Sequence, residues 1–84
     1  MKQKKSNPKK IVTNCDKLKG LLREKKKIYK ECALALGISE FQFRKKINGV
    51  IDFWVSEAIV LSDFLGLTNE EFIAVFLPNM IKIA

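Results

Sequence analysis

A helix that breaks at Gly37 and restarts at Ser39 is the feature that most constrains how this chain can fold. Before the break, apolar side chains recur at the i, i+3, i+4, i+7 spacing of one helix face: Tyr29, Cys32, Ala33 and Leu36. Gly37 accepts the left-handed backbone that ends a helix, and Ser39 followed by Gln42 matches the capping box that begins the next one. The sequence therefore predicts a helix over residues 28–36, a three-residue turn, and a second helix that continues to about residue 47.

Similar signals predict three further helices, so the expected fold is all-α with five helices. A first helix, from about residue 14 or 16 to residue 26, carries leucines at helical spacing: Leu18, Leu21 and Leu22. A fourth begins between residues 52 and 55 and ends at Gly66, with one apolar face: Trp54, Ala58, Leu61 and Leu65. The fifth begins with a capping box at Thr68 and Glu71, ends at Pro78, and has an inner stripe: Phe72, Val75 and Phe76. Only residues 80–84 show a weak strand-like alternation.

The composition fits one small globular domain that binds rather than catalyses. No apolar run approaches the roughly eighteen residues that span a membrane. The chain has no histidine, no glycine-rich phosphate loop and no paired carboxylates on one helical stripe. We therefore expect no enzyme activity, metal, cofactor or small-molecule substrate. Cys15 and Cys32 form neither a metal-binding nor a disulfide pattern, and we interpret them as thiols in a reducing cytoplasm.

Positive charge is concentrated in the first part of the chain. Residues 1–30 contain twelve Lys and Arg against two acids, whereas residues 31–84 contain four against seven. This segregation favours an anionic partner such as nucleic acid or a membrane surface, although a solubilising tail and solvated helix faces explain the same distribution. The lysine-rich start predicts a flexible basic arm over residues 1–12, followed by a folded domain over residues 13–77 and an apolar tail over residues 78–84.

The helix after the turn has two faces of different chemistry. Phe43 and Ile47, at i and i+4, anchor it from below. Four side chains occupy the opposite face at helical spacing: Phe41, Arg44, Lys45 and Asn48. A helix that is anchored on one face and cationic on the other is suited to enter the major groove of DNA. Ala33 is small where the two helices cross, and Ile38 fills the space beneath the turn, as a helix-turn-helix requires.

Three segments in this order resemble the lambda-repressor-like (Cro-type) helix-turn-helix domain over residues 16–77: LKGLLREKK, YKECALALGISEFQFRKKING and SEAIVLSDFLGLTNEEF. The nearest likeness is to small prophage-encoded regulators whose third helix ends in Lys-Ile-Asn, as KKING does here. The resemblance implies a five-helix fold whose turn is held by Ala33, Gly37, Ile38, Phe43 and Ile47. It also implies a cytoplasmic phage or prophage transcriptional repressor that binds a near-palindromic operator as a homodimer. Tyr29, Glu40 and Phe41 depart from the family, which often has Gln at the first position and small polar residues at the others.

The helix after the turn and its neighbours supply the expected DNA contacts. Base contacts are expected from Glu40, Phe41, Arg44 and Lys45. Contacts with the DNA backbone are expected from Lys17, Lys19, Lys27, Tyr29, Lys30, Ser39, Gln42, Lys46 and Asn48. Simpler explanations stay open, because helical charges are usually solvated, capping explains Gln42, and the helix dipole explains Glu40. Phe41 could also fold over the preceding helix instead of facing DNA.

Apolar side chains beyond the inner stripes predict a second copy of the chain as partner. They lie in the fourth and fifth helices and in the tail: Phe53, Val55, Ile59, Val60, Phe64, Ile73, Leu77, Met80, Ile81 and Ile83. A domain this small cannot bury them all, so we expect a homodimer through these segments. The main alternative is a helix-turn-helix protein-interaction module, antitoxin-like or a phage accessory protein, with non-specific nucleic-acid affinity from the lysine-rich arm. Non-specific RNA or membrane binding through that arm would leave Arg44 and Lys45 unexplained.

Overall fold

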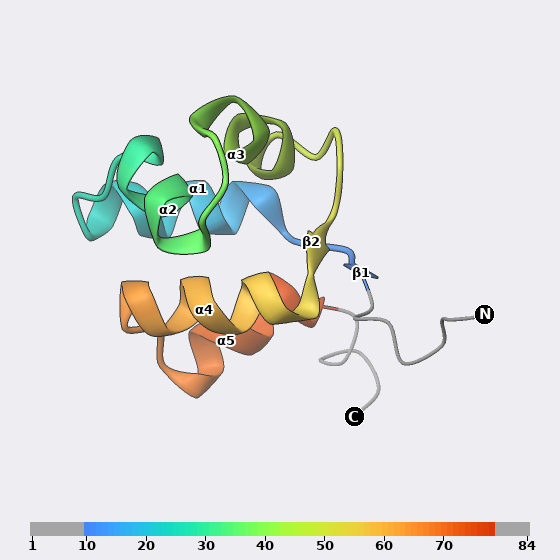
Figure 1. Ribbon diagram of the computed structural model, residues 1–84. Coiled ribbons are helices and arrows are strands. Elements are labelled where there is room, and N and C mark those ends of the chain that lie inside the picture. The colour runs from blue at the N-terminus through green and yellow to red at the C-terminus, as the bar shows by residue number, and fades with distance from the viewer. Residues whose placement is uncertain (1–9, 79–84) are drawn as a thin grey trace.

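The computed structural model describes residues 10–78, and this part of the chain contains five helices and one pair of short strands (Figure 1). The helices are α1 (Cys15–Glu24), α2 (Tyr29–Leu36), α3 (Glu40–Ile47), α4 (Val55–Leu65) and α5 (Asn69–Phe76). The strands are β1 (Lys10–Ile11) and β2 (Phe53–Trp54). The prediction of a mostly helical domain with five helices is confirmed. Most of the expected arm and nearly all of the expected tail lie outside the described residues.

Local backbone chemistry sets most of the helix ends, as the sequence predicts. Gly37 and Gly66 end α2 and α4 with φ angles of 71° and 67°, in the left-handed region that glycine adopts without strain. At the start of α3, the backbone N–H of Gln42 donates to the Ser39 hydroxyl oxygen at 3.0 Å. The contacts of the described residues include no return bond from the Gln42 side chain, so only the serine half of this capping box forms.

The end of α1 differs from the prediction, because α1 stops at Glu24 rather than at residue 26. Lys26 has a φ of 60°, and its N–H donates to the Arg23 carbonyl oxygen at 3.2 Å. The N–H of Lys27 donates to the Leu22 carbonyl oxygen at 2.9 Å. This hydrogen-bond pattern normally has glycine at the left-handed position. Since a lysine occupies it here, the sequence carries no signal for the helix end.

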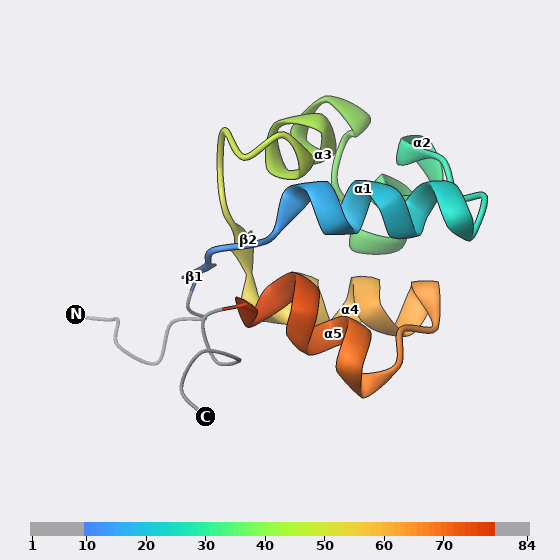
Figure 2. The same ribbon diagram turned by 180° about the vertical axis from the view of Figure 1, so that it is seen from behind.

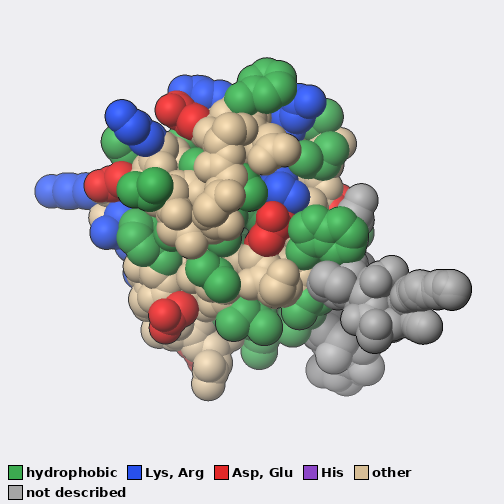
Figure 3. All heavy atoms as spheres, viewed as in Figure 1, with side chains coloured by type: hydrophobic (Ala, Val, Ile, Leu, Met, Phe, Trp, Pro, Cys, Tyr) green, Lys and Arg blue, Asp and Glu red, His purple; other side chains and the backbone are tan. Residues whose placement is uncertain are grey.

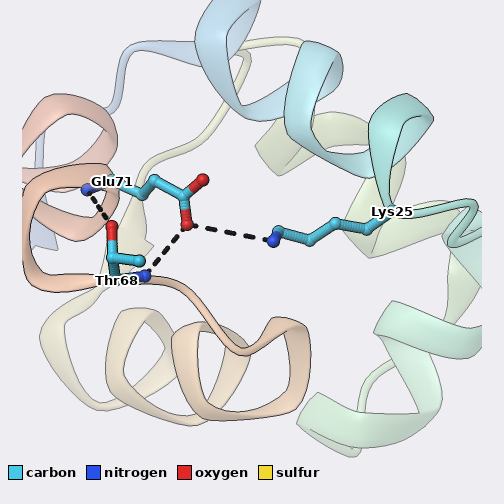
Figure 4. A network of polar contacts seen from close by, with 3 residues as sticks. All are labelled: Lys25, Thr68 and Glu71. Carbon is cyan, nitrogen blue, oxygen red and sulfur yellow. Dashed lines mark hydrogen bonds and ion pairs between the residues drawn. The ribbon is translucent and has the colours of Figure 1, made fainter.

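The start of α5 is tied to the end of α1 (Figure 4). Thr68 and Glu71 complete the predicted capping box: the Glu71 N–H donates to Thr68 Oγ1 at 3.1 Å, and the Thr68 N–H donates to Glu71 Oε1 at 2.9 Å. The same carboxylate oxygen lies 3.8 Å from Lys25 Nζ. Because both side chains keep contact with solvent, this ion pair contributes at most about 1 kcal/mol. It does direct Lys25 toward α5.

The strands β1 and β2 form an antiparallel ribbon, with Lys10 opposite Trp54 and Ile11 opposite Phe53. The expectation of a wholly helical chain was wrong on this point. Two residues per strand are too few for an alternating pattern, and their pairing joins segments that lie far apart in the sequence. The weak alternation at residues 80–84 lies outside the described residues.

The ribbon moves the start of the folded part toward the N-terminus. Ile11 packs against the core, whereas Val12 is 68% exposed and does not. Strand β1 therefore lies inside residues 1–12, the segment that the sequence assigns to the arm.

The helices α1 and α2 form a middle layer between α3 on one side and α4 with α5 on the other (Figures 1 and 2). α1 contacts α3 and α5, and α2 contacts α3 and α4. Helix α3 therefore lies on the opposite side of the molecule from α4 and α5.

The core takes side chains from all five helices and from β2. Its buried members are Leu18, Leu21, Leu22, Cys32, Ala33, Phe43, Ile47, Phe53, Ala58, Leu61, Leu65, Val75 and Phe76. A series of aromatic contacts crosses it, with centroid distances of 5.6 Å for Tyr29–Phe43, 6.1 Å for Phe43–Phe53 and 5.7 Å for Phe53–Phe76. Phe53 is fully buried, so its assignment to the surplus apolar surface was wrong: the ribbon turns this ring into the core.

Candidate nucleic-acid interface

Helix α3 joins the core through one face and exposes the other. Phe43 and Ile47 are both fully buried, which confirms the predicted anchor. On the outer face Phe41 is 67% exposed, Arg44 is exposed and Lys45 is half-exposed. The outer surface of α3 therefore combines an aromatic ring and two cations above a rigid base.

The connection between α2 and α3 has the packing that the sequence predicts. Ala33 is 3% exposed, and its carbonyl oxygen accepts from the Ile38 N–H at 3.0 Å. Ile38 is half-buried and packs against the core beneath the turn. Together with Gly37, these residues fix how α3 sits on α2.

Arg44 contacts two of the other predicted site residues. Its Nη2 donates to Glu40 Oε2 at 2.8 Å, one helical turn earlier on α3. Its guanidinium carbon lies 5.2 Å from the centre of the Tyr29 ring on α2. Arg44 thus bridges the two helices on their outer side.

Phe41 and Lys45 form a second pair on the same surface. The Nζ atom of Lys45 lies 4.6 Å from the centre of the Phe41 ring, within the range of a cation–π contact. The high exposure of Phe41 excludes the alternative in which its ring folds down over α2. An aromatic ring held in solvent by a cation is available to an incoming partner.

The prediction that Lys46 contacts the DNA backbone was wrong, because this side chain belongs to the interior and not to the outer surface of α3. It is 6% exposed, and its Nζ lies 2.9 Å from Glu57 Oε1 of α4. The same ammonium donates to the Asp52 carbonyl oxygen at 3.1 Å and lies 5.9 Å from the centre of the Phe53 ring. Since each residue of a helix is rotated by about 100° from the last, Lys46 points to α4 while Lys45 points outward.

Asn48, Ser39 and Gln42 lie at the ends of α3. The Asn48 side-chain amide donates to the Arg44 carbonyl oxygen at 2.8 Å, so it caps the end of α3. The Ser39 hydroxyl caps the other end, and the Gln42 side chain is exposed next to it. Capping explains Ser39 and Asn48, and leaves the Gln42 side chain free to meet a partner.

Tyr29 connects α3 to the basic surface of α1. Its half-buried ring packs against Phe43 and lies under the Arg44 guanidinium. The same tyrosine lines a shallow hollow with Lys19 and Arg23 of α1. Arg23 was missing from the predicted contacts, although its position four residues after Lys19, on the same helix face, is the signal that identifies it.

The remaining predicted backbone contacts are divided between different surfaces. Lys30 lines a hollow together with Glu40, next to the start of α3. Lys27 reaches the hollow at Tyr29, but its Nζ lies 4.8 Å from the centre of the Phe64 ring of α4. Lys17 is exposed on a different part of α1 and is not brought together with this cluster.

The distribution of charge on one face of the molecule follows this arrangement (Figure 3). Lys and Arg side chains gather over α2 and α3 and near the end of α1, with hydrophobic and a few acidic side chains between them. Over α4 the surface is hydrophobic or uncharged apart from acidic side chains. The cationic side of this view is therefore the side that presents α3.

Neither cysteine provides a reactive thiolate. Burial raises the pKa of Cys32 to about 11, and this side chain has no exposed surface. Burial also raises the pKa of Cys15, whose Sγ–H donates to the Lys46 carbonyl oxygen at 3.7 Å. Both groups therefore stay protonated at neutral pH.

Residues 10–78 contain no group of three or more His, Cys, Asp or Glu side chains that could hold a metal ion. None of the helices in that range is both long enough and apolar enough to cross a membrane. Comparisons with protein-family models, curated proteins and solved structures gave no match for this chain. The function is therefore inferred from the interface residues themselves.

Proposed function

We propose that this protein binds double-stranded DNA in a sequence-specific manner, with α2, the turn and α3 acting as a helix-turn-helix. The observation that carries the proposal is the outer face of α3, where Phe41, Arg44 and Lys45 stand above a fully buried anchor. A helix fits the major groove of B-DNA, which is about 12 Å wide. By resemblance to the lambda-repressor-like family, the corresponding biological role is that of a phage or prophage transcriptional repressor.

In this proposal the interface residues divide into two groups. Arg44 and Lys45 contact base edges, and Phe41 packs against a thymine methyl group. Phosphate groups are contacted by Lys19, Arg23 and Lys30. The phosphate contacts set the position of α3 in the groove and weaken as salt rises, but they carry no sequence information.

A homodimer completes the proposal, because two α3 helices about 34 Å apart would read both halves of a near-palindromic site. Four large apolar side chains of α4 and α5 are 36–57% exposed: Ile59, Val60, Phe64 and Ile73. Among the described residues of the predicted dimer surface, these four are the exposed ones. A second copy would stabilise the pair by about 25 cal/mol for each Å² of apolar surface that it removes from water.

The DNA-binding proposal is tested by fluorescence anisotropy. Duplexes selected from a random pool are titrated with the protein across a salt series. We expect a preference for selected over random DNA that persists at higher salt. Alanine at Arg44 or Lys45 should weaken specific binding by about 1–3 kcal/mol each. Lys17→Ala is the matched control, since it removes a cation that does not lie beside α3. An unchanged affinity of the Arg44→Ala, Lys45→Ala double variant for the selected duplex would refute the proposal.

Sedimentation at micromolar concentration tests the homodimer. We expect the wild type to dimerise and an Ile59→Asp, Val60→Asp variant to be monomeric. Val50→Asp serves as control, because Val50 is 70% exposed but lies outside α4 and α5. A monomeric wild type that binds one copy per site would contradict the dimer and leave the role of α3 intact.

A protein-interaction module is the second candidate, and one observation favours it. Leu34 on α2 is 81% exposed and lines an apolar hollow with Ala35 and Phe64. A surface of this kind is suited to a protein partner. Loss of all duplex preference in the titrations, in a chain that remains folded, would favour this second function.

A further inference from the structure

Arg44 is supported on two sides within the protein. Its Nη2 lies 2.8 Å from the Glu40 carboxylate, and its guanidinium lies over the Tyr29 ring at 5.2 Å. The Tyr29 ring is itself fixed, because it packs against the buried Phe43 at 5.6 Å. A free arginine side chain samples many rotamers, so these two supports confine the guanidinium to one region above α3.

We propose that Glu40 and Tyr29 are positioning residues that make Arg44 specific for guanine, so that α3 selects sites with a G·C pair at the position facing Arg44. This inference rests on the proposed DNA-binding function and deepens it. It also replaces the expectation that Glu40 contacts a base, because the Glu40 carboxylate is engaged by Arg44.

The guanidinium keeps enough donors for this role. Arginine carries five N–H groups in a planar fork, and the bond to Glu40 uses only one, at Nη2. Guanine presents O6 and N7 side by side as acceptors in the major groove, which matches the remaining N–H groups in pairs. Adenine has an amino donor where guanine has O6, so a fixed guanidinium would face a donor there.

The charge of Glu40 separates this role from simple helix stabilisation. An acid in the first turn of α3 favours the helix through its dipole whether or not Arg44 reads a base. A carboxylate on a DNA-facing surface also repels phosphates. If Glu40 only stabilised α3, its removal would strengthen binding to all duplexes alike. If Glu40 positions Arg44, its removal relaxes the preference at one base pair while binding to random DNA does not weaken.

The experiment compares three kinds of duplex: one selected from a random pool by the full chain, its single-base-pair substitutions, and a random sequence. We expect Glu40→Ala to reduce discrimination at one G·C pair by about tenfold. Arg44→Ala should lose the same preference, and the double variant should lose no more. Tyr29→Leu should act in the same direction. Glu70→Ala is the matched control, since Glu70 is an exposed acid in the first turn of α5 and does not contact Arg44.

The inference is overturned if Glu40→Ala keeps the wild-type preference at every base pair, or if Glu70→Ala gives an equal loss. Melting curves show whether each variant is still folded. Glu40→Gln keeps the shape of the side chain without its charge, and it therefore provides a second test of the ion pair with Arg44. A wild type without any preference would defeat the proposed function together with this inference. A wild type with a preference that ignores Glu40 would defeat this inference alone.

Discussion

Replacing Lys46 by Met should destabilise the protein far more than replacing any exposed lysine. Methionine keeps an unbranched chain of similar length, so the substitution removes the ammonium without leaving a large cavity. The ammonium that disappears is 2.9 Å from Glu57 Oε1 and donates to the Asp52 carbonyl oxygen at 3.1 Å. Both partners would then be left without the cation that they face.

The magnitude follows from the burial of this ion pair. The side chains of Lys46 and Glu57 are 7% and 15% exposed, so water can replace little of the missing interaction. Removing one partner of a buried ion pair costs about 3–5 kcal/mol, and the partial exposure of Glu57 places this case near 3 kcal/mol. A domain of this size has an unfolding free energy of about 5–15 kcal/mol, so a large share would disappear.

Urea denaturation followed by circular dichroism measures the effect. With a slope near 1 kcal/mol per molar urea, typical of small proteins, the midpoint should fall by about 3 M at unchanged slope. Glu57→Gln removes the carboxylate charge but keeps an oxygen for the Trp54 N–H, which donates to Glu57 at 3.0 Å. The Lys46→Met, Glu57→Gln double variant should therefore lose less stability than the sum of the two single variants.

Lys45→Met is the matched control, because Lys45 is the next residue and its ammonium lies over the exposed Phe41 ring. We expect a change within about 0.5 kcal/mol for this variant. An equally small loss of stability in Lys46→Met would contradict this role of the ion pair. So would a double variant whose loss equals the sum of the losses in Lys46→Met and Glu57→Gln.

Three further predictions concern the interface, the core and the first residues. In the proposed complex, uracil in place of the thymine that faces Phe41 should weaken wild-type binding by about 0.8 kcal/mol, because one methyl group is missing. Binding of Phe41→Ala, measured by the same anisotropy titration, should not change. An equal loss of affinity in both proteins would contradict a contact between Phe41 and the methyl group. Because burial raises the pKa of Cys32 to about 11, the stability that it provides is fully present below the unfolded-state pKa of about 8.5 and is lost as pH rises toward the folded value. Urea midpoints should fall with alkaline pH in the wild type but less in Cys32→Ala, and parallel curves would refute this. Deleting residues 1–9 removes four lysines and should flatten the slope of log affinity against log salt, by about 0.9 for each phosphate that is no longer neutralised. The melting temperature should not change. An unchanged slope would mean that these four lysines do not contact DNA.

Helix ends could be predicted wherever the backbone needs a particular residue. Gly37 and Gly66 both lie in the left-handed region, and Thr68 begins α5 with a complete capping box. These signals are local, so a single sequence contains them. The end of α1 has the same backbone geometry, but a lysine at φ 60° carries it, and local reasoning placed that end too late.

The ribbon and the burial of Phe53 could not be predicted, because they depend on contacts between distant segments. Ile11 pairs with Phe53, which lies far from it in the sequence, and each strand has only two residues. The spacing of apolar residues therefore led to the prediction that Phe53 lies on the fourth helix and is exposed there. Its place at the centre of the aromatic contacts exists only once β1 and β2 meet.

The orientation of the candidate site residues was predicted well where one helix determines it, and poorly where contacts with other elements determine it. Phe43 and Ile47 anchor α3, and Phe41 and Arg44 face outward, as helical spacing alone requires. Lys46 lies three residues after Phe43, on the buried face of α3, but its charge made it resemble the outward-facing Lys45. The acid that pairs with it, Glu57, lies on another helix, and local reasoning does not connect the two.

The ion pairs of α3 imply that, in the proposed complex, different residues determine the affinity for DNA and the preference for one DNA sequence. Arg44 is paired with Glu40 and Lys46 with Glu57, so among the described ion pairs Lys45 is the cation of α3 that has no acid. A helix with so little uncompensated charge attracts phosphates weakly. In the proposed complex, the general attraction to DNA therefore comes from the first thirty residues, which hold twelve Lys and Arg against two acids. Substitutions in α1, such as Arg23→Ala, should therefore change the salt slope and leave the preferred sequence unchanged, whereas substitutions in α3 should change the preferred sequence at a nearly constant slope.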